Sequence, residues 1–503
     1  MSKRNLAVAG IMLVIFLFAI DATIVSTAMP TIVARIGGLE LYSWVFSIYM
    51  LTSALTTPLF GKLSDVYSRR RLMLIGIGIF VAASTLCGAA QSMEALILFR
   101  AVQGLGGGAI YALSFIVVGV LFSAEQRAKV QGIISGIWGV ASVLGPLAGG
   151  VIVENWSWRW VFFVNLPVTA VAVPLIVTGL KESGQQRRAH KLDIYGTLTL
   201  LAALMLVFYV LSRSAHARQP VNLESAGLIS IALVLLVIFY SIERRAAEPI
   251  IPLDLFHAPF FKASTAVATL AAMGVFGAIS YLPLYLQGVI GLTASHAGMV
   301  LLFLSAAWTA GSLLAGQSLN RFGYRPLAAA GMLLMALGYL FFVGLSSALT
   351  VAWVIGSAIL IGTGMGMANL TTLVSVQNSI SHQRIGVATS TVMLFRTFGG
   401  AFAVSLMGTV LFNQMQRGLS TLAGSELSGE LLDKLAHPQN LLEPATRAQI
   451  PPELLPRLIA ILGDAIWFAF ATGLALMSLG VVISSFMARA TPADAAQEHD
   501  NAG

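Results

Sequence analysis

The sequence consists largely of a succession of apolar blocks, each roughly twenty residues long, which limits the folds that the chain can adopt. A helix of about 20 residues spans the roughly 30 Å hydrocarbon core of a bilayer. Only 10% of the 503 residues are charged, against about 25% in soluble domains. The chain is therefore predicted to be an all-α integral membrane protein. The fourteen predicted spans are residues 7–28, 43–63, 71–90, 95–120, 128–152, 160–180, 194–213, 223–242, 262–288, 296–318, 326–346, 351–377, 386–412 and 458–487.

The basic residues gather in loops on one side of the predicted membrane. A net charge of +8 can indicate a nucleic-acid partner, but most of the 29 Lys and Arg residues fall in short loops between apolar blocks. Positive charge in such loops marks the cytoplasmic side. We therefore expect both termini in the cytoplasm and no nucleic acid as a partner. The single cysteine, Cys87, cannot form an internal disulfide.

Two short basic loops relate the halves of the chain. The first runs from Gly61 to Arg71, and the second from Gly316 to Arg325, with Asn320 at the place of Asp65. Internal repeats of this kind are typical of secondary transporters. The predicted parts are an N-terminal six-helix bundle (1–185), two inserted transmembrane helices (186–248), a C-terminal six-helix bundle (249–490) with an outer loop (413–457), and a disordered tail (491–503). A short helix is predicted at 428–436.

A carboxylate stands inside the first predicted span, in the segment from Ile20 and Asp21 to Pro30. An acid placed in an apolar span can bind and release a proton, which coupling to a proton gradient requires. Asp21 can alternatively be structural and bonded to a neighbouring helix. Asp464, in the last span, is a second acid that either binds cations or faces water.

The fourth predicted span contains Arg100, followed by Gln103 and a glycine-rich run from Gly104 to Gly108. An arginine inside hydrocarbon must face protein or water because its exposure to lipid is costly. Arg100 and Asp21 are expected at similar depth. Our hypothesis is that Asp21 stays charged near Arg100 and takes up a proton when the two separate. The alternative is a structural arginine bonded to backbone carbonyls.

The fifth predicted span carries the sequence Gly145-Pro146-Leu-Ala-Gly149-Gly150. Small residues let membrane helices approach closely, and the proline removes a backbone hydrogen bond and permits a bend.

These motifs, in this order, resemble those of the major facilitator superfamily, and specifically its fourteen-helix drug:proton antiporter branch. The resemblance covers nearly the whole chain and implies two six-helix bundles plus two inserted helices. It implies that Arg100 belongs to a motif associated with proton transfer and that the segment from Gly145 to Gly150 is an antiporter signature. It also implies a conformational latch at Gly61, Asp65, Arg69, Arg70 and Arg71, for which ordinary positive loop charge is the alternative.

The chain departs from the family pattern at several positions. Ser68 stands in the first loop where Gly is usual, Ser26 replaces Asn in the first span, and Ala141 replaces Gly in the fifth. Asn320 in the second loop implies a weaker or missing second latch.

The predicted spans are poor in acids, which bears on the substrate. Arg396 lies in the thirteenth span, where many relatives that export cations have an acid, so dicationic substrates are disfavoured. Candidates for lining a substrate cavity are Gln103, Tyr281, Tyr285, Gln287 and Arg396. Flexible or aromatic side chains that suit varied ligands are further candidates, although such residues commonly serve in packing; they are Met12, Phe16, Phe276, Met365, Met367 and Met393.

The resemblance implies a proton-coupled antiporter that exports hydrophobic or amphipathic drugs by alternating access, in a bacterial cytoplasmic membrane. We expect a monomer that uses the proton gradient and needs no cofactor or metal. An exporter of a specific metabolite, amino acid or lipid remains open, as does a receptor that recruits a partner through 413–457. A membrane enzyme is disfavoured because the sequence has no Asp-x-x-x-Asp pair to hold a metal.

Overall fold

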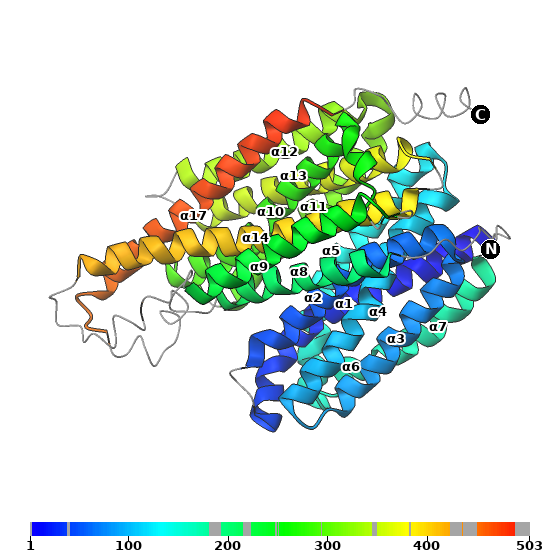
Figure 1. Ribbon diagram of the computed structural model, residues 1–503. Helices are drawn as coiled ribbons and strands as arrows, with labels where there is room; N and C mark the ends of the chain where they lie inside the picture. The colour runs from blue at the N-terminus through cyan, green and yellow to red at the C-terminus, as the bar shows by residue number, and fades with distance from the viewer. Residues whose placement is uncertain are drawn as a thin grey trace.

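The computed structural model describes residues 3–37, 41–180, 193–214, 223–246, 249, 251–292, 294–344, 350–381, 384–422, 435 and 450–487. Within these residues the regular structure is helical throughout (Figure 1). Eleven helical segments there are long and apolar enough to cross a membrane. The long helices α2, α5 and α8 bring the number to the predicted fourteen. The prediction of an all-α membrane fold is confirmed.

The first helices pack mainly against one another and form the N-terminal half of the molecule. The strongest packing pairs are α2 with α4, α3 with α4, α1 with α5 and α1 with α7. Their bounds are α1 (Lys3–Ile36), α2 (Tyr42–Val66), α3 (Arg69–Ala89), α4 (Met93–Leu121), α5 (Ala124–Asn155), the short α6 (Trp160–Phe163) and α7 (Asn165–Gly179).

The later helices form the C-terminal half in the same manner. Here α11 and α12 pack on α13, α10 packs on α14, and α17 packs on α12, α10 and α14. The bounds are η2 (Leu253–His257), α10 (Pro259–Gly288), α11 (Ala294–Phe322), α12 (Tyr324–Gly344), α13 (Val351–Asn378), α14 (Ile385–Ser420) and α17 (Leu455–Ser484).

Two further helices lie between the halves in sequence. They are α8 (Ile194–Ser214) and α9 (Leu223–Glu243), which pack on each other. Helix α8 also contacts α2 of the first half and α14 of the second. The proposed division of the chain at 185 and 248 stays a prediction.

The two halves meet along α5 with α11 and along α2 with α14. In Figure 1 the bundles lie close at the end that holds the N-terminus and diverge toward the other end. Near the end that holds the N-terminus, Gly132 on α5 lies against Ser312 on α11. We call the end at which α1 begins the closed end.

Several helices run further than the apolar blocks predict. Helix α1 continues to Ile36, eight positions past the predicted end, and α14 continues to Ser420, into the predicted outer loop. A helix satisfies its own backbone hydrogen bonds, so it can extend beyond the apolar segment into the polar boundary. The predicted helix 428–436 and the tail 491–503 lie outside the described residues, except for Leu435.

Candidate functional site

A buried ion pair joins α1 to α4. Arg100 Nη1 donates to Asp21 Oδ2 at 2.6 Å, and both side chains are shielded from solvent (1% and 0% exposed). Gln103 lies one helical turn beyond Arg100, accepts from Arg100 Nη1 at 2.9 Å and donates to Asp21 Oδ1 at 2.8 Å. The spacing of three residues puts Arg100 and Gln103 on one face of α4. The structure thus brings these three predicted residues together.

Asn165, with Ser84 behind it, completes the surroundings of Asp21, and neither residue was assigned a functional role from the sequence. Asn165, at the start of α7, donates to Asp21 Oδ1 at 3.0 Å and to Ser84 Oγ on α3 at 2.9 Å. Asp21 therefore accepts hydrogen bonds from Arg100, Gln103 and Asn165. Three donors around one carboxyl group suit its ionised form, which only accepts.

The guanidinium of Arg100 is also held from α2. Arg100 Nε donates to the carbonyl of Val45 at 3.3 Å, and Arg100 Cζ lies 4.0 Å from the centroid of the Tyr49 ring. A cation over a desolvated aromatic face is attracted by about 2 kcal/mol. Both sequence interpretations of Arg100 thus have a structural counterpart, because it pairs with Asp21 and also bonds to a backbone carbonyl.

The glycines of α4 permit this close arrangement. A Cβ at Gly104 would lie 1.9 Å from Thr52 Oγ1 and 2.5 Å from the Tyr49 carbonyl. A Cβ at Gly108 would lie 2.3 Å from the Ser53 carbonyl. The two glycines are four residues apart, so they form one small-residue face against α2. That face sets the distance at which Arg100 meets Tyr49.

The glycine–proline segment of α5 packs on α1 close to Asp21. A Cβ at Gly145 would lie 2.0 Å from Thr23 Oγ1, and Thr23 Oγ1 donates to the Ala141 carbonyl at 3.2 Å. Gly149 is buried, whereas a Cβ at Gly150 would meet no atom within 4 Å. Helix α5 continues through Pro146 without interruption. Of Gly145 and Gly150, it is Gly145 that packs closely against α1.

The predicted latch connects the two halves at the closed end. Asp65 Oδ1 accepts from the backbone N–H of Gly386 at 3.1 Å, and Asp65 Oδ2 accepts from that of Val387 at 3.0 Å. These amides belong to the first turn of α14, where a carboxylate interacts favourably with the helix dipole. Arg69 Nη2 lies 3.9 Å from Asp65 Oδ1. A Cβ at Gly61 would lie 2.0 Å from Ser390 Oγ, so Gly61 allows α2 to contact α14.

The remaining residues of the predicted latch lie at the start of α3. Arg70 and Arg71 lie in the first turn of α3, and Ser68 is its N-cap, accepting from the Arg71 backbone N–H at 3.3 Å. A serine is a favourable N-cap because its oxygen satisfies a free helix N–H. The departure from the family pattern at Ser68 therefore has a local structural role.

A second connection at the closed end was not predicted. Arg127, at the start of α5, donates to the Gln377 carbonyl at 3.0 Å and to Asn378 Oδ1 at 2.6 Å, both at the end of α13. Gln131 donates to Gln377 Oε1 at 2.5 Å. Asn320, by contrast, is exposed and makes no side-chain hydrogen bond in the described part of the chain. The sequence indicated only a basic loop residue at Arg127, because its partners lie 250 positions away.

The residues predicted to line a substrate cavity do not lie together. Gln103 belongs to the Asp21 cluster, Tyr285 packs against Phe342 in the C-terminal core (centroids 4.8 Å apart), and Tyr281 Oη donates to the Val404 carbonyl at 2.5 Å. Gln287 is half-buried near the end of α10, and Asp464 is exposed on α17.

Arg396 lies apart from the others, between the halves. It donates to Asn369 Oδ1 on α13 and to Tyr111 Oη on α4. Of the apolar candidates, Met365 and Met393 are fully buried in the core, whereas Phe276 is 40% exposed.

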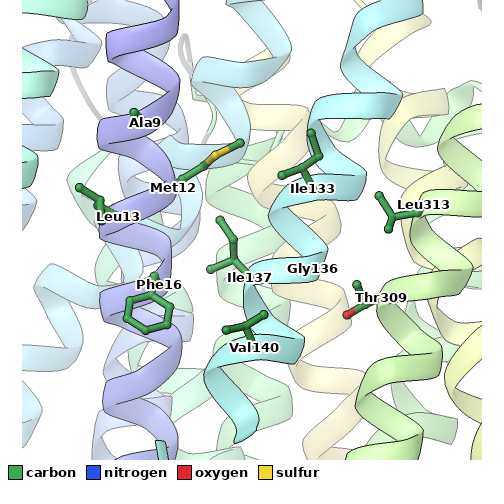
Figure 2. Close-up of a pocket in the computed structure, with 10 residues that line it drawn as sticks. All are labelled: Ala9, Met12, Leu13, Phe16, Ile133, Gly136, Ile137, Val140, Thr309 and Leu313. Atoms are coloured by element: carbon green, nitrogen blue, oxygen red, sulfur yellow. The ribbon is translucent and has the colours of Figure 1, made fainter. Parts of the chain in front are cut away.

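An apolar cavity of about 710 Å³ lies between α1, α5 and α11 toward the closed end (Figure 2). Met12 and Phe16, two of the predicted apolar candidates, line it from α1. The other lining residues are Ala9, Leu13, Ile133, Gly136, Ile137, Val140, Thr309 and Leu313. Its walls come from both halves of the molecule, and its lining suits apolar groups.

Comparisons with known proteins agree with this architecture. Residues 11–404 match the family described as Major Facilitator Superfamily. The chain is 35% identical to Multidrug transporter protein MdtP of Bacillus subtilis, over 97% of this chain and 93% of that protein. It is 32% identical to Multidrug resistance protein 3 of the same organism, over 97% and 96%.

Solved structures share the fold at low sequence identity. The human organic anion transporter MFSD10 (TETRAN) has a TM-score of 0.64 and 15% identity, with 96% of this chain and 100% of that chain covered. The proton:xylose symporter XylE has a TM-score of 0.62 and 13% identity, with 95% of each chain covered.

Proposed function

This chain belongs to the Major Facilitator Superfamily of membrane transporters, and from that premise we propose that it exports hydrophobic or amphipathic compounds in exchange for protons, by alternating access. Relatives named as multidrug proteins support export as the direction and drug-like compounds as the substrate class. The observation that carries the proton-coupling part is the buried pair of Asp21 and Arg100.

Asp21 is the proposed proton carrier. It lies fully buried in the long apolar helix α1, with Arg100 as its counter-ion. Removing one partner of a buried ion pair is strongly unfavourable because the other charge is left uncompensated. When Arg100 moves away, Asp21 must therefore bind a proton, and when Arg100 returns, the proton is released. This gives one carboxyl group two protonation states that depend on the distance to one arginine.

Gln103 and Asn165 are the proposed positioning residues of this exchange. Both donate to Asp21 Oδ1, leaving Oδ2 to Arg100. Their amides remain neutral, so they orient the carboxyl group in either protonation state. The proton-accepting oxygen is therefore Oδ2, the atom that Arg100 exposes by leaving.

The conformational part of the proposal concerns the closed end. Asp65 and Arg127 each bond from the N-terminal half to a helix end of the C-terminal half. Alternating access requires these contacts to break when the halves rotate, so both residues favour the closed arrangement. The positive charge of the loops at this end supports its position in the cytoplasm. The described conformation is then closed to the cytoplasm, with both chain termini on that side of the cell membrane.

The packing of α5 on α1 supports coupling between these two parts. Thr23 contacts Gly145 and lies two residues from Asp21. Helix α5 itself contacts α11 in the other half. A rotation of the halves that moves α5 is therefore transmitted to α1 close to the proton carrier.

Efflux of three dyes from energised cells tests the proposed function. Cells expressing the wild type are loaded with ethidium, rhodamine 123 or fluorescein, and efflux is followed with and without a protonophore. Efflux of at least one dye that stops on protonophore addition is expected. Efflux that persists with the gradient dissipated contradicts proton coupling. Absence of efflux for every dye contradicts broad export and favours an exporter of one metabolite, amino acid or lipid.

A further inference from the structure

Arg396 occupies the middle of the molecule at the junction of the two halves. It lies eleven residues into α14, which corresponds to about 17 Å from the closed end at 1.5 Å per residue. Its hydrogen-bond partners are Tyr111, ten residues before the end of α4, and Asn369, nine residues before the end of α13. All three residues therefore lie at about the same depth, and they come from both halves.

The charge of Arg396 is not neutralised by any residue that the structure describes. Its two hydrogen-bond acceptors are a phenol oxygen and an amide oxygen, which are both neutral. Within the described residues no carboxylate lies within salt-bridge distance, whereas Arg100 has Asp21. An arginine at this depth normally pairs with a counter-ion or faces water. The guanidinium carries five N–H groups, so donors remain for a further acceptor.

Both the arginine and its surroundings are open to a ligand. The side chains of Arg396 and Tyr111 are only half-buried. The amide nitrogen of Asn369 has no hydrogen-bond acceptor among the described residues, although the amide oxygen accepts from Arg396. A guanidinium and an amide N–H that converge on one place suit a carboxylate, sulfonate or phosphate oxygen.

An aromatic cluster lies beside this donor set. The Tyr111 ring stacks on Phe18 of α1 (centroids 5.4 Å apart) and meets Trp138 of α5 edge-on (6.2 Å). Trp138 also contacts Phe18 at 5.7 Å. Aromatic side chains stack well on flat aromatic ligands. The site therefore combines a cation that has no carboxylate partner among the described residues with a group of ring faces.

We propose that Arg396 binds the anionic group of the exported substrate, and that the preferred substrates are aromatic or amphipathic organic anions. The inference rests on the proposed export function and specifies its substrate class. The oxygen of the ligand replaces Tyr111 as an acceptor of Arg396. Because Tyr111 belongs to the other half, this replacement removes one bond between the halves. Substrate binding thereby promotes the rotation that alternating access requires.

Two dyes with the same xanthene ring and opposite charge test the inference. Fluorescein is anionic and rhodamine 123 is cationic at neutral pH. Binding of each dye to purified protein in nanodiscs is measured by fluorescence polarisation, and the ratio of the two affinities is the readout. Arg396→Gln is expected to weaken fluorescein binding about 10- to 100-fold, the effect of losing a hydrogen bond to a charged group. Rhodamine 123 binding is expected to change less than about threefold. Arg396→Lys is expected to restore most of the wild-type ratio of fluorescein to rhodamine 123 affinity.

Two further variants separate ligand binding from a structural role. Tyr111→Phe removes the same bond between the halves but keeps the cation, so it is expected to preserve the affinity ratio. Arg417→Gln, an exposed arginine on the same helix, is the matched control. The inference is overturned if Arg396→Gln leaves the ratio of fluorescein to rhodamine 123 affinity unchanged. It is also overturned if Tyr111→Phe changes this ratio as much as Arg396→Gln does. Either result favours a purely structural arginine.

The outcome for the wild type distinguishes this inference from the proposed function. Protonophore-sensitive efflux of rhodamine 123 without binding or efflux of fluorescein overturns the anion site and leaves proton-coupled export intact. Fluorescein binding that depends on Arg396, together with efflux that the protonophore does not affect, supports the anion site at Arg396 and contradicts proton coupling.

Discussion

Arg100 Nη1 and Asp21 Oδ2 lie 2.6 Å apart in a region of the protein that water does not reach. The pair joins the first and fourth helices and is held by the neutral donors Gln103 on α4 and Asn165 on α7, and by the ring of Tyr49 on α2. Each charge compensates the other. In the proposed mechanism, proton exchange at Asp21 requires a movement of Arg100, so that the protonation state of Asp21 depends on conformation.

Loss of Arg100 alone is expected to destabilise the protein strongly. Arg100→Gln leaves Asp21 buried without its counter-ion, which costs about 3–5 kcal/mol. The double variant Asp21→Asn/Arg100→Gln removes both charges and is expected to recover most of this loss. Thermal unfolding of the purified variants measures the effect, with Arg417→Gln as the exposed control. An unchanged Tm for Arg100→Gln, or a double variant no more stable than it, is the contrary result.

Removal of the Asp65 charge is expected to open the closed end more often. Asp65→Asn loses the interaction of a carboxylate with the start of α14, worth about 1 kcal/mol, or roughly a fivefold shift in the equilibrium. A cysteine at the buried contact, Ser390→Cys in a Cys87→Ser background, reports opening through its labelling rate with a thiol reagent. Asp65→Asn should raise that rate about fivefold.

The same assay tests the unpredicted contact of Arg127. Arg127→Gln is expected to raise the labelling rate as well, and the two effects should add in the logarithm of the rate because the residues bond to different helices. Asn320→Ala, at the exposed position of the second loop, serves as the control and should leave the rate as it is. Equal rates in all variants would mean that these contacts do not hold the closed end.

Transport is expected to depend on Gly145 and not on Gly150. A methyl group at Gly145 would lie 2.0 Å from Thr23 Oγ1, so Gly145→Ala must push α5 away from α1, whereas Gly150→Ala meets open space. Thr23→Ala should partly rescue Gly145→Ala, because the nearest remaining atom would then be Thr23 Cβ at 2.9 Å. Efflux rates at matched expression measure this. Equal rates for the two glycine variants would show that the close contact at Gly145 has no functional importance.

The sequence predicts the helical framework well because a membrane imposes a simple rule. Each span needs about 20 apolar residues, so the fourteen blocks are visible without any knowledge of tertiary contacts. The predicted positions of the helix ends are less accurate. Helices α1 and α14 extend into polar sequence, where hydropathy no longer distinguishes helix from loop. The family and the fold class are confirmed, and the roles of the site residues stay proposals.

The residues of the candidate site differ in whether the sequence alone identifies them. Asp21 and Arg100 were identifiable because a charge in an apolar block is conspicuous, and the structure joins them. Asn165 and Arg127 carry no such signal: one is a polar residue at the start of a helix, and the other is one basic loop residue among many. Their partners lie 144 and 250 or more positions away, and only the folded chain brings them together.

Transport driven by an imposed proton gradient measures whether Asp21 carries the proton, with Asp21→Asn compared with wild type in proteoliposomes. Rhodamine 123 and fluorescein serve as substrates, and both uphill accumulation and exchange without a gradient are recorded. Wild type is expected to accumulate dye against its gradient, whereas Asp21→Asn is expected to lose accumulation but still exchange dye across the membrane. Asp21→Asn that accumulates dye as well as wild type would contradict Asp21 as the proton carrier.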